Sequence, residues 1–205
     1  IICATALLAL TASSSWGAAI TATWTPGVAG SWTDGASWTF GTPPATATFP
    51  SNGGGDNFNV LVDNGGAGNS TVSLNTNVTI DSLGVSGGDT VNFVNSFDMT
   101  VTSGAITNNG AINVTSTGTA TDLTLQGAAA INGTGTITLG NNGSNRILGT
   151  LGNSITQGSG HTIQGAGSVL IGTGGFVNQG TIVANQSTPL NISPGVEGFD
   201  NTSGI

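Results

Sequence analysis

The sequence predicts an all-β protein, and more specifically a right-handed parallel β-helix, which is a β-solenoid. Over residues 108–140, small polar residues alternate with Ile, Val and Leu, and alternation with period two is typical of strands that bury one face. Gly and Asn interrupt these runs and supply the positive-φ positions that tight turns need. Since no sustained helical period follows the first residues, we expect essentially no helix there.

A β-sandwich is the alternative architecture, because many short strands separated by turns also describe it. A sandwich must protect its edge strands, usually with charged side chains, whereas a stack of coils hides every edge except those at its two ends. The chain has 205 residues but only one Lys or Arg and nine Asp or Glu. This scarcity of charge favours the solenoid.

The first 19 residues resemble a secretory signal peptide that lacks its basic start. An apolar run over residues 1–12 is followed by Gly17, Ala18 and Ala19, a small-residue pattern that predicts cleavage after Ala19. The run is shorter than the ~20 apolar residues that a membrane-spanning helix needs. We therefore expect a protein that is secreted or exposed at the cell surface. Because the chain begins with Ile and ends in strand-like sequence, we also expect a fragment of a longer protein.

Residues 20–57 differ in composition from the rest of the chain. They contain Trp24, Trp32 and Trp38 together with four of the six Pro, a mixture that suggests turns around an aromatic cluster. We expect an N-terminal cap that covers the end of the β-stack. The alternative is an exposed aromatic platform on which sugar rings stack, which would make these indoles carbohydrate contacts.

Residues 58–205 are predicted to form the solenoid itself. The expected strands are short and irregularly spaced: 58–63, 71–74, 78–80, 90–94, 99–102, 111–114, 122–125, 135–139, 160–163, 168–171, 180–184 and 190–193.

Weak internal repeats support the stacking. Residues 131–139 (INGTGTITL) match 163–171 (IQGAGSVLI), and 109–112 (NGAI) match 179–182 (QGTI). Repeats of about 20 residues are typical of solenoids, in which a single coil is too small to be stable alone.

Two stretches resemble known bacterial surface proteins. The segment WTPGVAGSWTDGASWTFGTPP resembles the opening, after the signal peptide, of autotransporter-like and PEP-CTERM-associated proteins. The segments LTLQGAAAINGTGTITLGNN, HTIQGAGSVLIG and FVNQGTIVAN resemble the β-helical repeats of those proteins and of filamentous-haemagglutinin-like adhesins. The resemblance implies an exported right-handed β-helix that serves as an adhesin or matrix component.

Few residues of this chain could carry out catalysis. A nucleophilic triad needs a His beside a carboxylate, but His161 is the only His, and no Asp or Glu is near it in the sequence. Cys3 is the only Cys and lies in the predicted leader, so we expect no disulfide, thiol nucleophile, metal site or cofactor in the mature chain. The net charge of −8 argues against binding to nucleic acids or to anionic membranes, because proteins bind these negatively charged partners through Lys and Arg.

Polysaccharide-cleaving β-helices need clustered acids with supporting cations. Gly160-His161-Thr162 is only a faint match to such enzymes, and Arg146 is the sole cation. Carboxylates on different coils could still meet at the distance that a glycosidase uses; the residues concerned are Asp81, Asp89, Asp98 and Asp122. We expect no enzyme activity. For the segment 53–56 (GGGD), a turn is favoured over a calcium site.

The leading hypothesis is therefore a non-enzymatic, exported structural or adhesive β-solenoid: a stalk, an adhesin, or a component of an extracellular matrix or fibre. Its partners would be a glycan or another cell-surface ligand, or further copies stacked end to end. The first alternative is a carbohydrate-binding surface module. The second is an ice-binding protein, suggested by Thr-x-Thr pairs such as Thr46/Thr48 and Thr136/Thr138; against it, these pairs do not recur in the sequence at evidently equivalent positions.

Overall fold

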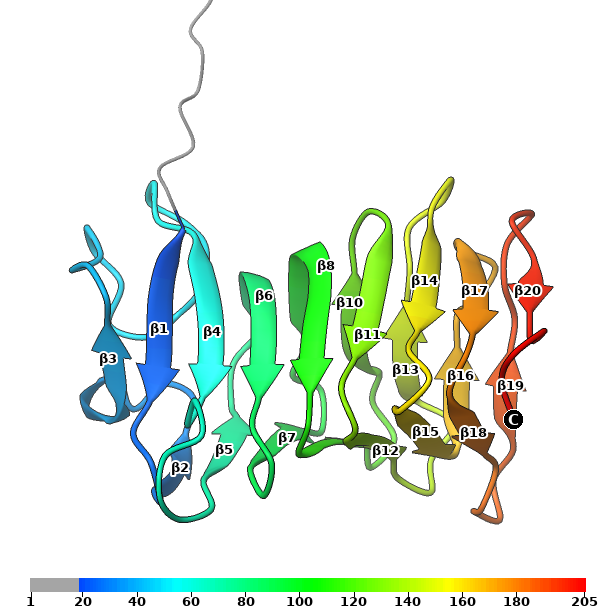
Figure 1. The fold of residues 1–205 in the computed structure, drawn as a ribbon, viewed down its shortest axis with the longest axis horizontal. Helices are drawn as coiled ribbons and strands as arrows, with labels where there is room; N and C mark the ends of the chain where they lie inside the picture. Colours follow the sequence, from blue (N-terminus) through cyan, green and yellow to red (C-terminus); the bar gives the residue numbers. More distant parts are fainter. Residues whose placement is uncertain (1–18) are drawn as a thin grey trace, which may run out of the picture.

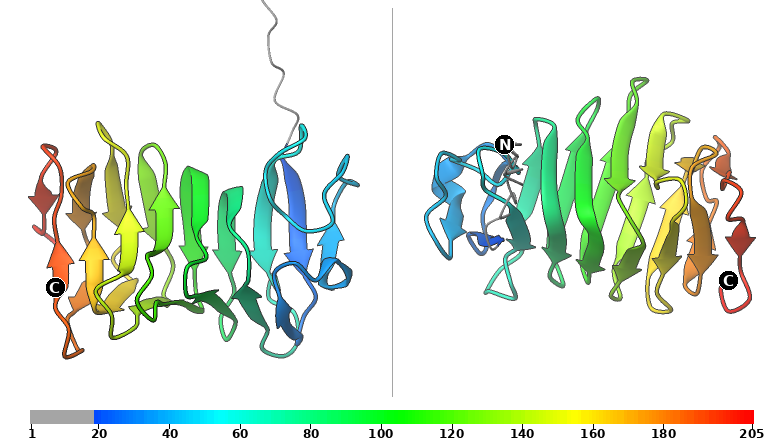
Figure 2. Two further views of the ribbon diagram at one scale, coloured as in Figure 1. Left: turned by 180° about the vertical axis from the view of Figure 1, so that it is seen from behind. Right: turned by 90° about the horizontal axis from the view of Figure 1, so that it is seen from above.

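The computed structural model describes residues 19–205 as a parallel β-solenoid of about six turns. Figure 1 shows the coils following one another along the long axis, and in the views of Figure 2 the colours keep the same order. Strands of neighbouring coils pair in parallel throughout the stack. The predicted β-solenoid is thus confirmed, and the β-sandwich, whose sheets are antiparallel, is wrong.

Twenty strands and one short 3-10 helix make up the described chain. Their bounds are β1 (Ile20–Trp24), β2 (Ala29–Ser31), η1 (Gly35–Ser37), β3 (Trp38–Phe40), β4 (Phe58–Val62), β5 (Thr71–Leu74), β6 (Val78–Val85), β7 (Thr90–Val94), β8 (Met99–Asn108), β9 (Ala111–Thr115), β10 (Thr121–Leu125), β11 (Ala129–Asn132), β12 (Thr136–Leu139), β13 (Asn145–Leu148), β14 (Ser154–Gln157), β15 (Thr162–Gly165), β16 (Gly167–Val169), β17 (Gly175–Asn178), β18 (Thr181–Val183), β19 (Leu190–Ile192) and β20 (Phe199–Asp200).

Each coil has three sides, which belong to two sheets. One is a seven-stranded sheet of β2, β5, β7, β9, β12, β15 and β18. The other has thirteen strands and bends within the long strands β6 and β8. The second halves of these two strands join β1, β4, β11, β14, β17 and β20 in the front face of Figure 1, and their first halves join β10, β13, β16 and β19 in the rear face.

The core is a set of aliphatic columns that run along the axis. In the seven-stranded sheet, one column is Val72, Val91, Ile112, Ile137 and Ile163, paired coil to coil and fully buried. Each such side chain contributes about 1.5–3 kcal/mol by leaving water. Paired residues of the first two coils are 38 to 42 positions apart. In the later coils the separation is 19 to 26 positions, so the number of residues per coil is not constant.

Residues 20–57 supply both a coil and a cover for its end. β1 and β2 pair in parallel with β4 and β5, and so form the first coil of the stack. β3 pairs antiparallel with the free side of β1, and at the left of Figure 1 it lies outside β1. It therefore occupies backbone groups of β1 that another strand could otherwise use.

Several sequence expectations need correction. The strands predicted to end at residues 80 and 102 continue to Val85 and Asn108, because the ladder between them resumes beyond the corner of the coil, after a register shift between Ile80 and Ser82. Strands β1, β2 and β3 of the expected cap were not predicted, and neither were β11, β13, β14, β17 and β20. None of them has two Ile, Val or Leu residues at period two.

One of the two repeat alignments is right and the other is wrong. Ile112 and Ile182 share a column, as the 109–112 and 179–182 match predicts. Ile163, in contrast, pairs with Ile137 and not with the coil position of Ile131, which pairs with Gln157. Unequal coil lengths shift the register between the aligned segments.

Candidate functional site

The three indoles predicted as a cap or a carbohydrate contact lie in the interior of the first coil. Trp24 and Trp32 are fully buried and Trp38 is 6% exposed. The ring centroids of Trp24 and Trp32 lie 4.9 and 5.0 Å from that of Trp38. Each indole N–H donates to a backbone carbonyl, of Val28, Pro50 and Trp32 respectively. Because no ring face is open to solvent, a sugar has no surface on which to stack here.

The predicted cleavage position lies at the edge of the described structure. β1 begins at Ile20, directly after Ala19. Residues 1–18 lie outside the described residues, so the signal peptide stays a prediction.

His161 is fully buried at a corner of the coil, where the chain passes from the front face into the seven-stranded sheet. Its Nε2 lies 3.1 Å from Nδ2 of Asn108, two coils away. Burial lowers the pKa of His161 from 6.5 to about 4, so the imidazole is neutral at pH 7. A neutral Nε2 accepts the hydrogen bond that the Asn108 amide donates.

His161 belongs to a longer set of buried polar side chains at this corner, which we call the polar corner. Its members either end a front-face strand or lie in the turn before a strand of the seven-stranded sheet: Asp63, Ser70, Asp89, Asn108, Gln157, His161 and Asn178. The side-chain amide of Gln157 donates to the backbone carbonyls of His161 and Thr181. The side-chain oxygen Oδ1 of Asn178 accepts from the Gly180 N–H. The corner thus adds side-chain hydrogen bonds to backbone groups of the turns.

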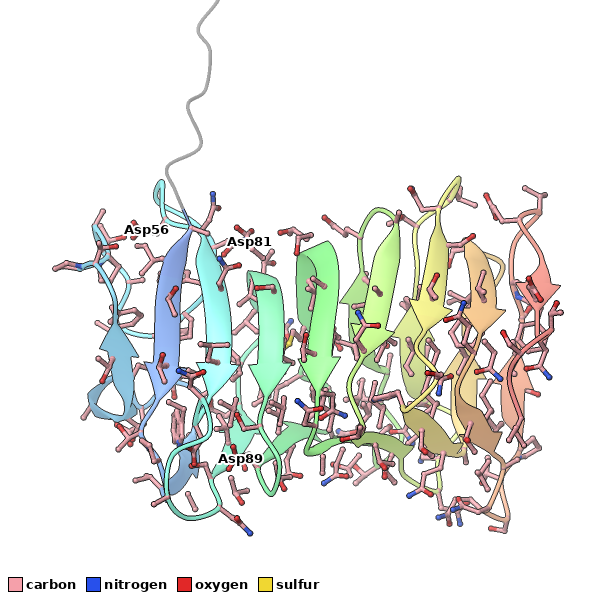
Figure 3. The ribbon with its side chains drawn as sticks, viewed as in Figure 1. Asp56, Asp81 and Asp89 are labelled. Carbon is pink, nitrogen blue, oxygen red and sulfur yellow. The ribbon has the colours of Figure 1, made fainter. Side chains whose placement is uncertain are left out.

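Two carboxylates meet in the polar corner. The Ser70 N–H donates to Asp89 at 2.8 Å, and the Ser70 hydroxyl donates to Asp63 at 3.1 Å. Burial, together with the neighbouring Asp63 charge, raises the pKa of Asp89, although the Ser70 N–H opposes this. Figure 3 shows Asp89 at the lower edge of the molecule and Asp56 and Asp81 near the upper edge, so these three acids do not converge.

Asp122 in β10 and Asp98, directly before β8, belong to the rear face, whereas Asp81 lies at the corner within β6. Arg146 forms a two-bond ion pair with Asp122, at 2.6 and 2.5 Å, and the Asp122 N–H donates to Asp98 at 2.8 Å. Burial raises the pKa of Asp98. Asp81 accepts from the Asn52 amide and the Thr102 hydroxyl. These bonds tie neighbouring coils together.

Asp56, at the end of the glycine segment 53–56, holds a loop of its own. Its carboxylate accepts the Ala45 N–H at 2.8 Å, and Gly53 and Asp56 form an isolated antiparallel bridge. This geometry is that of the expected turn.

The outer face of the seven-stranded sheet differs from the rear face, which carries Asp122 and Arg146, in having no charge. None of its seven strands contains Asp, Glu, Lys or Arg. The buried aliphatic residues alternate with half-buried outward ones, and the outward ones align in two columns. We call them the threonine column (Ala29, Thr71, Thr90, Ala111, Thr136, Thr162 and Thr181) and the polar column (Ser31, Ser73, Asn92, Asn113, Thr138, Gln164 and Val183).

The two columns make different hydrogen bonds. In the polar column, Asn113 donates to Asn92 at 2.9 Å and Gln164 donates to Thr138 at 3.1 Å. Within residues 19–205, in contrast, the five threonine hydroxyls of the threonine column have no hydrogen-bond partner in the protein. The polar column is therefore braced by hydrogen bonds between its side chains. The threonine column is a row of hydroxyls that can still donate and accept.

This face was not predicted from the sequence, although a signal was present. The strands share a short pattern of Thr or Ala, an aliphatic residue, and then mostly a polar residue, as in TVS, TVN, AIN, TIT and TIQ. The expectation that Thr-x-Thr pairs do not recur at equivalent positions is confirmed, and what recurs on most coils is a single Thr. Thr136/Thr138 is the one strand of this sheet in which both members are Thr.

Three further findings are negative. In the part of the chain from residue 19 onward, no helix is long and apolar enough to cross a membrane. The same part contains no group of three or more His, Cys, Asp or Glu side chains that could hold a metal ion. Comparisons of the chain with family models, curated proteins and solved structures find no match.

Proposed function

We propose that this chain is part of an exported, non-enzymatic β-solenoid that acts as a structural or adhesive element outside the cell. The observation that carries the proposal is the uncharged outer face of the seven-stranded sheet, which repeats the same polar positions on successive coils. A repeated, neutral surface suits weak contacts made many times over, and such contacts add up strongly when the partner is also repetitive.

Other features support this proposal. The apolar pattern of residues 1–19 supports export. Asp122 is neutralised by Arg146, and His161 is buried away from any acid of the rear face, which supports the absence of catalysis. End-to-end association of copies is part of the same proposal. At the N-terminal end, however, β3 covers β1 and works against it.

The location of the protein in the cells that produce it tests the proposal. Intact cells are treated with a protease, and the protein is followed with an antibody raised against this chain. We expect the protease to remove the signal while a cytoplasmic marker stays intact. A protein protected in intact cells and recovered in the cytoplasmic fraction would overturn export. For adhesion, the purified chain should compete with attachment of the cells to their surface.

A further inference from the structure

We propose that the outer face of the seven-stranded sheet binds an extended, uncharged polysaccharide, a β-linked glucan, which lies along the threonine column. This inference rests on the proposed adhesive function and names the class of its partner. It places carbohydrate contact on a face different from that of the buried indoles of the first coil.

Charge selects the class of polymer. The chain has a net charge of −8, so polymers of uronic acids or sulfated sugars are repelled. The seven strands of this sheet contain no charged residue, while Asp98, Asp122 and Arg146 lie on the rear face. A neutral polymer is therefore matched to the seven-stranded sheet better than to the rear face.

The front face is also nearly uncharged, apart from Asp81 at its corner and Asp200 in β20. Its outward positions, however, include Leu61, Gly84 and Val177 instead of a row of threonines.

The hydrogen-bonding groups are free and already positioned. The hydroxyls of Thr71, Thr90, Thr136, Thr162 and Thr181 are half-buried and, among the described residues, have no protein partner. A β-branched side chain is stiff about χ1, and the polar column beside it is braced by the Asn113 to Asn92 bond. A sugar hydroxyl both donates and accepts, as a threonine hydroxyl does. Binding to pre-ordered groups loses little side-chain entropy.

The repeat distance suits a polymer. Neighbouring strands lie about 4.8 Å apart, which is close to the length of one sugar unit in an extended β-linked glucan. Successive sugars can thus meet successive strands, and several weak contacts act together.

The polar column argues against an ice plane as the partner. Its side chains differ in length, from Ser73 through Asn92 to Gln164, so the face is uneven at the scale of single atoms. A rigid crystal plane needs an even surface, whereas a polymer chain adjusts its conformation to each side chain.

Retention of the full 205-residue chain on insoluble cellulose tests the inference. The test variant is the triple substitution Thr90→Val, Thr136→Val and Thr162→Val, which removes three hydroxyls from the threonine column and keeps the β-branched shape. The matched control makes the same change in an outward threonine column of the neighbouring face, in Thr79, Thr100 and Thr124. Circular dichroism and thermal melting confirm that both variants fold.

We expect the wild type and the control to be retained, and the test variant to lose about tenfold or more in affinity, since three hydrogen bonds are removed. Retention on the acidic polymer alginate should be negligible. No retention of the wild type on cellulose, or equal loss in both variants, overturns the inference. Thermal hysteresis without cellulose retention overturns it in favour of ice. Protease protection in intact cells would defeat export but leaves the cellulose result unaffected, so the two failures are distinguishable.

Discussion

The early and the later coils fill the polar corner with different kinds of buried polar side chain. In the early coils the buried polar groups are Asp63, Ser70 and Asp89, whereas in the later coils they include Asn108 and His161. Asp89 and His161 occupy equivalent positions, each directly before a residue of the threonine column. One half buries carboxylates close together, and the other buries a neutral imidazole against an amide.

Because of this difference, lowering the pH changes the stability of the two halves in opposite directions. The folded state raises the pKa of Asp89, so it favours the protonated form, and this contribution to stability is lost as the pH rises through the folded pKa. The folded state lowers the pKa of His161 to about 4, so it favours the neutral form, and this contribution is lost as the pH falls below 6.5. Lowering the pH should therefore stabilise the early half as Asp89 is protonated, and destabilise the later half as His161 becomes charged.

The largest expected effect comes from protonating His161. As the pH falls from 7 to 5, the free energy of unfolding should drop by about 2 kcal/mol, and by up to about 3 kcal/mol at pH 4, since the unfolded state takes up the proton first. Urea unfolding at a series of pH values measures this. The variant His161→Gln lacks the titrating group and should show a flat profile between pH 7 and 5. The same slope in both proteins would contradict the assignment.

An intermediate effect is expected at Asn108. Replacing it by Leu leaves the buried Nε2 of His161 and the Gly110 N–H without their partners, at a cost of about 2 kcal/mol in unfolding free energy. The neighbouring Asn109 is exposed, so Asn109→Leu is the matched control and should lose less than about 1 kcal/mol. Urea denaturation of the two variants at pH 7 compares them, and equal losses would argue against a buried role for Asn108.

The smallest expected effect has the opposite sign. Asp89→Asn removes one of two neighbouring buried charges and keeps an oxygen for the Ser70 N–H, so it should stabilise the protein at pH 7 by on the order of 1 kcal/mol. The gain should shrink in acid, where Asp89 of the wild type is itself protonated. Asp200 is exposed, and Asp200→Asn should change little. Destabilisation by Asp89→Asn, measured by thermal melting at pH 7, would mean that the negative charge is required.

Strands with two or more aliphatic residues at period two could be predicted from the sequence, as at β5, β7 and β12. Strands such as β13 and β14 could not, because they form in ladders whose neighbours supply most of the buried surface. The repeat was hidden for a related reason, since turns of different length separate the equivalent positions.

The candidate face depended on register, which the sequence does not display. Thr90 and Thr136 are unremarkable as separate threonines and become one surface only when the pairing aligns them through Ala111. The same holds for the polar corner, where Asn108 meets His161 across 53 residues. The buried indole of Trp32 likewise donates to the carbonyl of Pro50, in a loop with no pattern of its own.

The short rise of each coil has a mechanical consequence. A coil of about 20 residues adds about 4.8 Å to the length of the stack, but the same residues fully extended span about 70 Å. Under tension, a solenoid that loses one coil therefore lengthens by more than ten times the height of that coil. A filament built in this way can absorb a sudden pull at one end while the remaining coils, each held by its own ladders, stay intact.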